Sequence, residues 1–504
     1  MSDQVTRRGF IGGSAVALGF AFAGAGSLDP FVREAAAATT RPALGYGPLQ
    51  YKAGEVIALP EGFSYKILGE VGKMTEGGIV HPDDPDAMGV FERPAGGSIL
   101  VTNHENGGSE AYPVPHDNAD IVYDEGGIGG TTTIEVDADG NNVLQYASAA
   151  GHVNNCAGGI TPWGTWLTCE ETEARAGGKL TKDHGYVFEV DPTSQAANHG
   201  KSNLPLKFLG RFAHEATATD PRTGHIYLTE DAGNPNGLYF RWSPPAGYRL
   251  GKDSLLDLAV DGAVEVGKLE AMKCFDADGN HVADLAAATD FNTSYRVRWV
   301  PVPDRDARQV SIRRQFSDDE VTRSRKLEGQ WWGDGGAYFV CSFARLSDGS
   351  VNEHDGQVWF FDPRKERITL KTIFGVNPDV DNENNHFDGP DNITVSAHGG
   401  LILAEDGSGK SHLVGVTEQG KSYPLALNQS SDSEFAGPAF SADGKTLFVN
   451  IQSGPGYTLA ITGPWGRPSN AAPHANTGNG NPQRNSRGNS EHRNKRNDDG
   501  NNDD

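Results

Sequence analysis

Apolar and polar positions alternate in short runs through most of the chain, and few stretches show the 3.6-residue period of an amphipathic helix. The 65 glycines and 28 prolines interrupt these runs with frequent turns. One unit recurs: an aliphatic strand ends in an acidic or amide residue, and a second strand follows after a turn. The first strands of these units begin at residues 99, 166, 226, 337, 401 and 447.

Apart from one gap of 111 residues (226 to 337), the units are spaced by about 46–67 residues, which suits a four-stranded propeller blade with its loops. The gap holds an insertion around 245–325, in which 255–263 and 317–327 have helical character. The pattern predicts an all-β fold, a six-bladed β-propeller with this partly helical insertion. A β-sandwich or two unrelated domains are the alternatives.

The two ends of the chain differ from its body. Residues 1–38 contain Arg7 and Arg8, then an apolar stretch and four alanines, which is typical of a twin-arginine export signal. Residues 467–504 are rich in Asn, Gly, Ser, Arg and Asp, and we expect a disordered polar tail. Residues 39–466 then form a single β-propeller catalytic domain. No other stretch approaches the length of a membrane helix, so we expect no stable membrane span.

The formal net charge is −24, and nearly all of it falls in the body of the chain. Such acidity argues against nucleic acid as a partner. It would also repel an anionic substrate unless bound cations reversed the local field.

Acidic residues follow the apolar strand in four of the six units: Glu105, Glu171, Asp231 and Asp406. If equivalent strands surround one axis, these side chains meet at one mouth of the channel. Converging carboxylates repel unless cations bind between them. The sequence therefore predicts a metal site at this mouth, although acidic residues also favour turns for local reasons.

Residues 153–173 place Cys156 in a glycine-flanked turn and end on paired glutamates that include Glu171. Thiolate binds iron, and carboxylate oxygens bind iron or calcium. The alternative is a disulfide, because four cysteines in an exported protein allow two, and Cys156 could pair with Cys169. We expect Cys169, Cys274 and Cys341 to be structural.

The wording of this stretch, Asn-Asn-Cys-Ala-Gly-Gly-x-Thr-Pro-Trp-Gly-Thr-Trp-Leu-Thr-Cys-Glu-Glu, resembles the signature of the PhoX-type alkaline phosphatases, which are exported propeller enzymes. The similarity covers roughly residues 45–465. Four further matches follow in order, at 211–216, 228–231, 389–392 and 434–441.

The resemblance implies a ferric pair bridged by a cysteine and an oxo group, beside calcium ions. It places metal ligands at Cys156, Glu171, Glu215 and Glu328, with Asp391 and Asn392 in a Pro-Asp-Asn motif that borders the metals. The acidic turns add Glu105, Glu405, Asp406 and Glu434 as weaker candidates.

The family usually has an arginine two residues before the glutamate of its Glu-Gly motif, as a phosphate clamp, and here Lys326 takes that place. Lysine offers a point charge instead of a bidentate fork, which puts rate and substrate preference in doubt. Lys326 and Glu215 are the candidate catalytic residues. Arg323 and Arg325 could substitute for the missing arginine, but we expect them on a solvated helix face.

The sequence and the resemblance together predict an exported, metal-dependent phosphomonoesterase that releases phosphate from organic esters. The expected partners are small phosphate esters and the twin-arginine export machinery, and we expect a monomer in the periplasm, at the cell surface or secreted. The alternatives are a lactonase-like hydrolase, in which Cys156 has no role, and a calcium-stabilised binding module without phosphatase activity.

Overall fold

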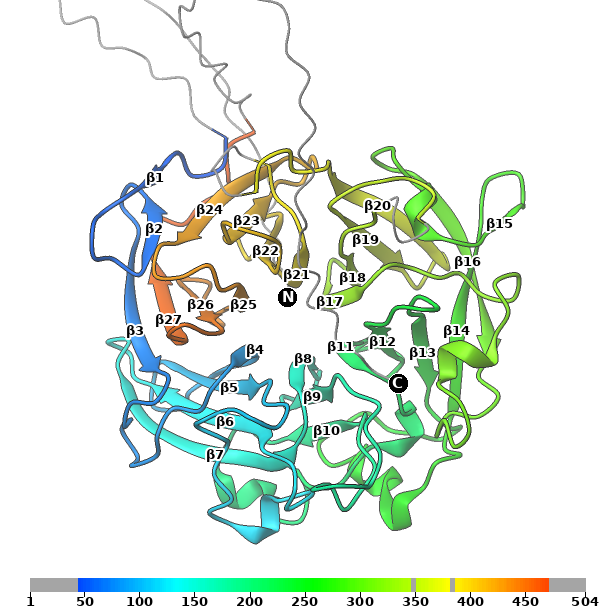
Figure 1. Cartoon of the computed structure of the whole chain (residues 1–504), viewed down its shortest axis with the longest axis horizontal. Coiled ribbons are helices and arrows are strands. Elements are labelled where there is room, and N and C mark those ends of the chain that lie inside the picture. Colours follow the sequence, from blue (N-terminus) through cyan, green and yellow to red (C-terminus); the bar gives the residue numbers. More distant parts are fainter. Residues whose placement is uncertain (1–43, 346–349, 381–385, 471–504) are drawn as a thin grey trace, which may run out of the picture. The chain divides into compact units, whose positions relative to one another are not determined.

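The computed structural model describes residues 44–345, 350–380 and 386–470. The expected export signal, and the expected tail beyond residue 470, lie outside these residues. Within them the fold is all-β, with strands that surround a common centre in a propeller-like arrangement (Figure 1). None of the helices in the described ranges is long and apolar enough to cross a membrane.

The strands form five hydrogen-bonded sheets, all antiparallel between neighbours. The first contains β4 (Pro85–Glu92), β5 (Ser98–His104), β6 (Gly129–Val136) and β7 (Asn142–His152). The second contains β8 (Asn155–Ile160), β9 (Trp166–Glu170) and β10 (Val187–Val190).

A 10-stranded sheet joins two four-stranded runs through an outer strand. The first run is β11 (His214–Thr219), β12 (Ile226–Glu230), β13 (Tyr239–Ser243) and β14 (Lys268–Phe275), with β15 (His281–Val282) beside β14. The second run is β17 (Leu327–Gly333), β18 (Gly336–Cys341), β19 (Gly356–Asp362) and β20 (Arg367–Phe374). The outer strand is β16 (Ser294–Pro301), which pairs with both β14 and β20.

Two sheets contain strands from both ends of the described chain. One is β21 (Pro390–Val395), β22 (Leu401–Glu405), β23 (His412–Val416) and β24 (Ser422–Asn428), extended by β2 (Ile57–Pro60) and β1 (Leu49–Gln50). The other is β25 (Phe435–Phe440), β26 (Thr446–Ile451), β27 (Tyr457–Thr462) and β3 (Ser64–Glu70). The early strand β3 thus completes the last sheet and closes the ring of sheets.

The innermost strands β4, β8, β11, β17, β21 and β25 each contact the next, and β25 contacts β4 (Figure 1). Apolar side chains between the sheets form the core, with one cluster around Phe212, Phe240 and Trp242 and another around Tyr239, Phe339 and Trp359. Burial of large aromatic side chains of this kind is a major source of stability.

The repeating strand pairs expected from the sequence are all present, as β5–β6, β9–β10, β12–β13, β18–β19, β22–β23 and β26–β27. The expectation of six separate blades is met only in part, because one sheet of 10 strands holds two of the repeats.

The expected helical insertion is largely wrong. Its strongest apolar runs form β14 and β16, which complete the sheet. Helix is limited to short 3₁₀ segments at Leu256–Leu258, Val260–Gly262, Leu285–Ala287 and Ile312–Gln315, and there is none at 317–327. Just beyond the predicted domain end at residue 466, Ser469 forms a β-bridge with Gly45.

Candidate metal centre

Each innermost strand carries a β-bulge close to its first residue. In β4 the pairing register shifts between Pro85 and Met88, and Asp86 lies in the gap. A bulge leaves an extra residue unpaired and re-aims its side chain. The residues at the equivalent place in the other strands are, in chain order, Cys156, Glu215, Glu328, Asp391 and Gly437. One local irregularity therefore supplies a metal-binding type of side chain from five of the six strands.

The sixth position has no room for a side chain. A Cβ on Gly437 would lie 2.5 Å from the Cα of Ala87, and the φ of Gly437 is +59°. Its backbone N–H instead donates to Oδ1 of Asn392 at 2.5 Å.

Residues in the left-handed region precede four of these strands. They are Asp84 (φ +44°), Asn154 (φ +51°), Lys326 (φ +32°) and Gly389 (φ +56°). Non-glycine residues adopt such φ values at a cost of about 1–3 kcal/mol, and they concentrate at functional sites. This turn directs the chain into the bulge that follows it.

The predicted convergence of the acidic turns is confirmed. The carboxyl of Glu171 interacts electrostatically with Asp231 and Glu105, and the carboxyl of Asp406 interacts with Asp231. These four acidic residues directly follow β5, β9, β12 and β22, which are the first strands of their repeats, and they lie at the same end of the sheets as the bulge residues.

Two groups of ligand atoms stand out within this acidic cluster. Cys156, Glu171 and Glu215 form one, and Glu215, Glu328 and Asp391 form the other; in each, the atoms lie within 4.8 Å of one another. Glu215 belongs to both, and its side chain is buried. The arrangement is therefore two adjoining sites that share one carboxylate.

The cluster has little compensating positive charge. Burial, followed by the charge of Asp406, raises the pKa of Asp391 to about 8. Burial likewise raises the pKa of Glu105 to about 7. The pKa values of the Glu215 carboxyl and the Cys156 thiol are also raised, first by burial and then by neighbouring carboxylates. Protons or metal cations must hold such a cluster together.

Lys326 is the one cation that the described residues place against this cluster. Its Nζ lies 3.2 Å from Glu328 and 3.7 Å from Asp231. The charges of Glu328 and then of Asp231 raise the pKa of Lys326 well above its usual value, so the side chain stays protonated.

Other predicted site residues hold different places. Asn392 donates to Oδ1 of Asp391 at 3.1 Å and accepts from Gly437, so it orients Asp391. Glu434 borders the cluster and interacts with Asp406 and Asp391.

The structure gives the carboxylate of Glu405 partners away from the acidic cluster. Its Oε1 accepts from the N–H of Asp388 at 2.7 Å, and its Oε2 accepts from the N–H of His412 at 2.8 Å and lies 2.7 Å from His412 Nδ1. As the last residue of β22, it points to the opposite side from Asp406. Its carboxylate closes the turn between β22 and β23.

Asp86, which the sequence analysis did not name, lies against Glu105 and Asp391 in the acidic cluster. It is buried, and its Oδ1 has no hydrogen-bond partner among the described residues. The side-chain amide of Gln452 donates to Oε2 of Glu105 at 2.8 Å and to Oδ2 of Asp86 at 3.3 Å. The dipeptide Pro-Asp stands at Pro85-Asp86 and again before Asn392, but also at 82–83, 303–304 and 378–379, so no sequence signal singles out Asp86.

The disulfide alternative is also wrong. All four cysteines are free and buried. The Cys156 thiol donates to the backbone oxygen of His214 at 3.4 Å, whereas Cys169 packs in the apolar core with Leu167 and Val187.

The two arginines near Lys326 do not lie on a solvated helix face. Arg323 is buried and donates to the carbonyls of Asn236 and Phe316, and Arg325 donates to the side chain of Asn236. Both arginines hold the loops around β17.

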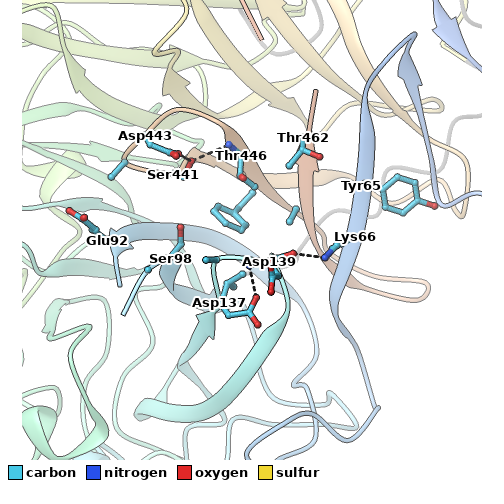
Figure 2. Close-up of a pocket in the computed structure, with 18 of the residues that line it drawn as sticks. Tyr65, Lys66, Glu92, Ser98, Asp137, Asp139, Ser441, Asp443, Thr446 and Thr462 are labelled. Carbon is cyan, nitrogen blue, oxygen red and sulfur yellow. Dashed lines mark hydrogen bonds between the residues drawn. The ribbon is translucent and has the colours of Figure 1, made fainter. Parts of the chain in front are cut away.

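A groove with a volume of about 690 Å³ lies at the other end of the same strands, between the β4–β7 sheet and the β25–β27 sheet (Figure 2). Glu92, Ser98, Asp137 and Asp443 line it. Asp86 begins β4 and Glu92 ends it, so this groove is separate from the metal centre.

Solved structures of other proteins resemble this chain. The structure of Pseudomonas fluorescens PhoX in complex with vanadate, described as a transition state analogue, matches with a TM-score of 0.60 and 18% identity over 84% of this chain and 98% of that chain. A gluconolactonase from Xanthomonas campestris matches with a TM-score of 0.37 and 12% identity over 84% of this chain and 99% of that chain. No curated protein matches the sequence.

The first of these matches supports the propeller-like fold. The sequence profile described as alkaline phosphatase PhoX matches residues 44–145 and 138–456, which is most of the chain and includes every residue of the acidic cluster. The chain therefore belongs to the PhoX family of alkaline phosphatases, which are phosphate-ester hydrolases.

Proposed function

We propose that this protein is an exported, metal-dependent phosphomonoesterase whose metals bind at the acidic cluster of the candidate metal centre. The observation that carries the proposal is the pair of ligand groups that share Glu215 in a buried, strongly acidic setting. Family membership provides the phosphatase activity, and the cluster provides the reason for metal dependence.

The residues fit divalent or trivalent cations. Oδ1 of Asp86 and Oε1 of Glu215 are buried and have no hydrogen-bond partner within the described ranges, which is costly unless a cation or water binds there. Hard carboxylate oxygens suit calcium, and a thiolate beside carboxylates suits ferric iron. We therefore assign the iron pair to the group around Cys156 and calcium to the neighbouring carboxylates. The proposed ligands are Cys156, Glu171, Glu215, Glu328 and Asp391, with Asp86, Glu105, Asp406 and Glu434 beside them.

Bound metals would supply Lewis-acid stabilisation of charge on the phosphoryl oxygens. The contribution of the chain itself centres on Lys326. Its ammonium group is the cation at the acidic cluster, and it can attract a phosphate dianion that the carboxylates alone would repel. Glu215, the second candidate catalytic residue, is shared by both ligand groups, so metals in both groups would depend on it.

The test is hydrolysis of p-nitrophenyl phosphate by protein purified in folded form, with metal content measured on the same sample. We expect iron and calcium in the protein and activity that a calcium chelator abolishes. Calcium alone without phosphatase activity would instead favour a lactonase-like hydrolase or a binding module.

Export is a separate part of the proposal and rests on the residues around Arg7 and Arg8. Replacement of both arginines by lysine should stop export by the twin-arginine route. Cell fractionation of the variant tests this, and unchanged export would contradict it.

We also propose that the fold be counted as six blades. The ring of contacts among the six innermost strands supports this count. In this count β16 is an extra strand that joins the outer edges of two blades.

A further inference from the structure

A hydrogen-bonded relay of buried side chains runs from the backbone of Asp86 across the seam between the first and last sheets. Asn450 on β26 donates through Nδ2 to the carbonyl of Asp86. Thr458 on β27 donates through its hydroxyl to Oδ1 of Asn450 at 2.7 Å. Nε2 of His81 lies 3.3 Å from the same hydroxyl oxygen. Because the hydroxyl proton is used on Asn450, His81 must donate from Nε2.

The relay continues into the first sheet. Gln145 on β7 donates through Nε2 to Nδ1 of His81 at 3.0 Å and to the hydroxyl of Thr132 at 3.2 Å. Thr132 lies 2.9 Å from Nε2 of His104, and Nδ1 of His104 lies 2.9 Å from the carbonyl of Asp83. That carbonyl can only accept, so His104 donates from Nδ1 and accepts from Thr132.

Every donor and acceptor in the relay therefore has a consistent role, and both histidines are neutral. Burial lowers the pKa of His81 to about 4, in agreement with a neutral ring. The relay side chains are fully buried: His81, His104, Thr132, Gln145, Asn450 and Thr458. A complete buried network of this kind rigidifies what it holds.

The two ends of the relay hold the turn that places Asp86. They bind the carbonyls of Asp83 and Asp86, on either side of Asp84 with its left-handed φ of +44°. The closing strand β3 contributes directly, since a Cβ on Gly69 would lie 2.6 Å from the His81 ring. Glycine at this position lets the His81 ring pack directly against the backbone of β3.

We propose that the relay from Asn450 to His104 is a positioning device, which fixes Asp86 and the adjoining Glu105 for cation binding and couples closure of the ring of sheets to the metal centre. The inference rests on the proposed metal-binding role of Asp86. Thr458 is a positioning residue in this account and touches no metal or substrate.

The test compares calcium binding by the full-length protein and its variants in competition with a chelator of known affinity. Thr458→Val keeps the shape of the side chain and breaks the relay between Asn450 and His81. We expect calcium binding about 10-fold weaker, within the range of 10–100-fold that loss of outer-sphere support causes. Thr458→Ser keeps the hydroxyl and should restore the affinity.

Thr372→Val is the matched control. Thr372 is buried, and its hydroxyl donates to the carbonyl of Gly420 at 3.1 Å, outside the relay. It should lose stability in the metal-free form about as Thr458→Val does, yet keep the calcium affinity of the wild type. If Thr458→Val cannot be purified, Thr132→Val breaks the relay between Gln145 and His104 and should weaken calcium binding in the same way.

Calcium binding by Thr458→Val equal to that of the wild type would overturn the positioning role. Equal weakening in Thr458→Val and Thr372→Val would also overturn it, because general destabilisation would then explain the loss. A wild-type protein that binds neither calcium nor iron would contradict the proposed function itself.

Discussion

The two ends of the inner strands use carboxylates in opposite ways. At the metal centre, burial and neighbouring carboxylates raise the pKa of Asp391 to about 8. At the groove of Figure 2, hydrogen bonds from Lys445 and Ser441 lower the pKa of Asp443 to about 2. Asp137, in the same groove, accepts the N–H groups of Asp139 and Asn141. A carboxylate that closes its own turn is structural, and one that lacks donors is available to a cation.

The largest expected effect is at the residue shared by the two ligand groups. Glu215→Gln removes one negative charge from both. We expect loss of bound metal and a fall in kcat/KM of more than about 100-fold, since outer-sphere changes alone reach that range. Metal analysis and p-nitrophenyl phosphate hydrolysis measure it.

Glu405→Gln is the control for this change, because Glu405 is a buried glutamate whose partners are His412 and Asp388. It should lower stability and keep the metals. Loss of metal from both variants would break the distinction between turn-closing and cation-binding carboxylates.

Metal removal should have the next largest effect. Cations that bind only the folded state at 1,000 times their Kd stabilise it by about 4 kcal/mol. Chelation should therefore lower the Tm by about 5 °C for each such cation in a domain of this size, as measured by scanning calorimetry. The carboxylates of the groove accept hydrogen bonds from the protein itself. A Tm unchanged by chelator would show that the metal-centre carboxylates also need no cation for stability.

Lys326 is the next test of the contrast between the metal centre and the groove, because its ammonium group contacts Glu328 and Asp231 of the acidic cluster. Lys326→Ala should raise KM for p-nitrophenyl phosphate about 10-fold, in line with about 1.4 kcal/mol lost from a charged contact. Lys326→Arg keeps the charge and offers a bidentate donor, so KM should stay near the wild-type value or fall. An unchanged KM in Lys326→Ala would remove the lysine from phosphate binding.

The sequence predicted the strand pairs and the convergence of Glu105, Glu171 and Asp231 because both depend on a short repeat that is visible in the chain. It could not predict the bulges, because no particular residue type marks the extra residue of a bulged strand. The sequence analysis did not name Asp86 for this reason: the bulge, and not the residue type, turns it toward the centre.

Two differences between the sequence analysis and the structure have a related cause. Glu405 and Asp406 are adjacent acids, and only the alternation of side chains along β22 decides which one reaches the cluster. The segment around 255–263 has a helical pattern, but it supplies two short 3₁₀ turns because the following β14 extends the sheet. Tertiary pairing overrides a weak local preference in both places.

The smallest expected effect is at the groove. Asp443→Asn should change the Tm at pH 7 by about 2 °C or less, because the site is exposed. The folded-state pKa of Asp443, about 2, lies below its ordinary value of 3.8, so its charge stabilises the fold above pH 4. That contribution is lost as the pH falls toward 2. The difference in unfolding free energy between wild type and variant, measured with urea from pH 7 to pH 3, should therefore narrow below pH 4, with metal content unchanged throughout. A variant that lost metal would place this carboxylate in the same class as Asp391 and end the contrast between the two ends of the strands.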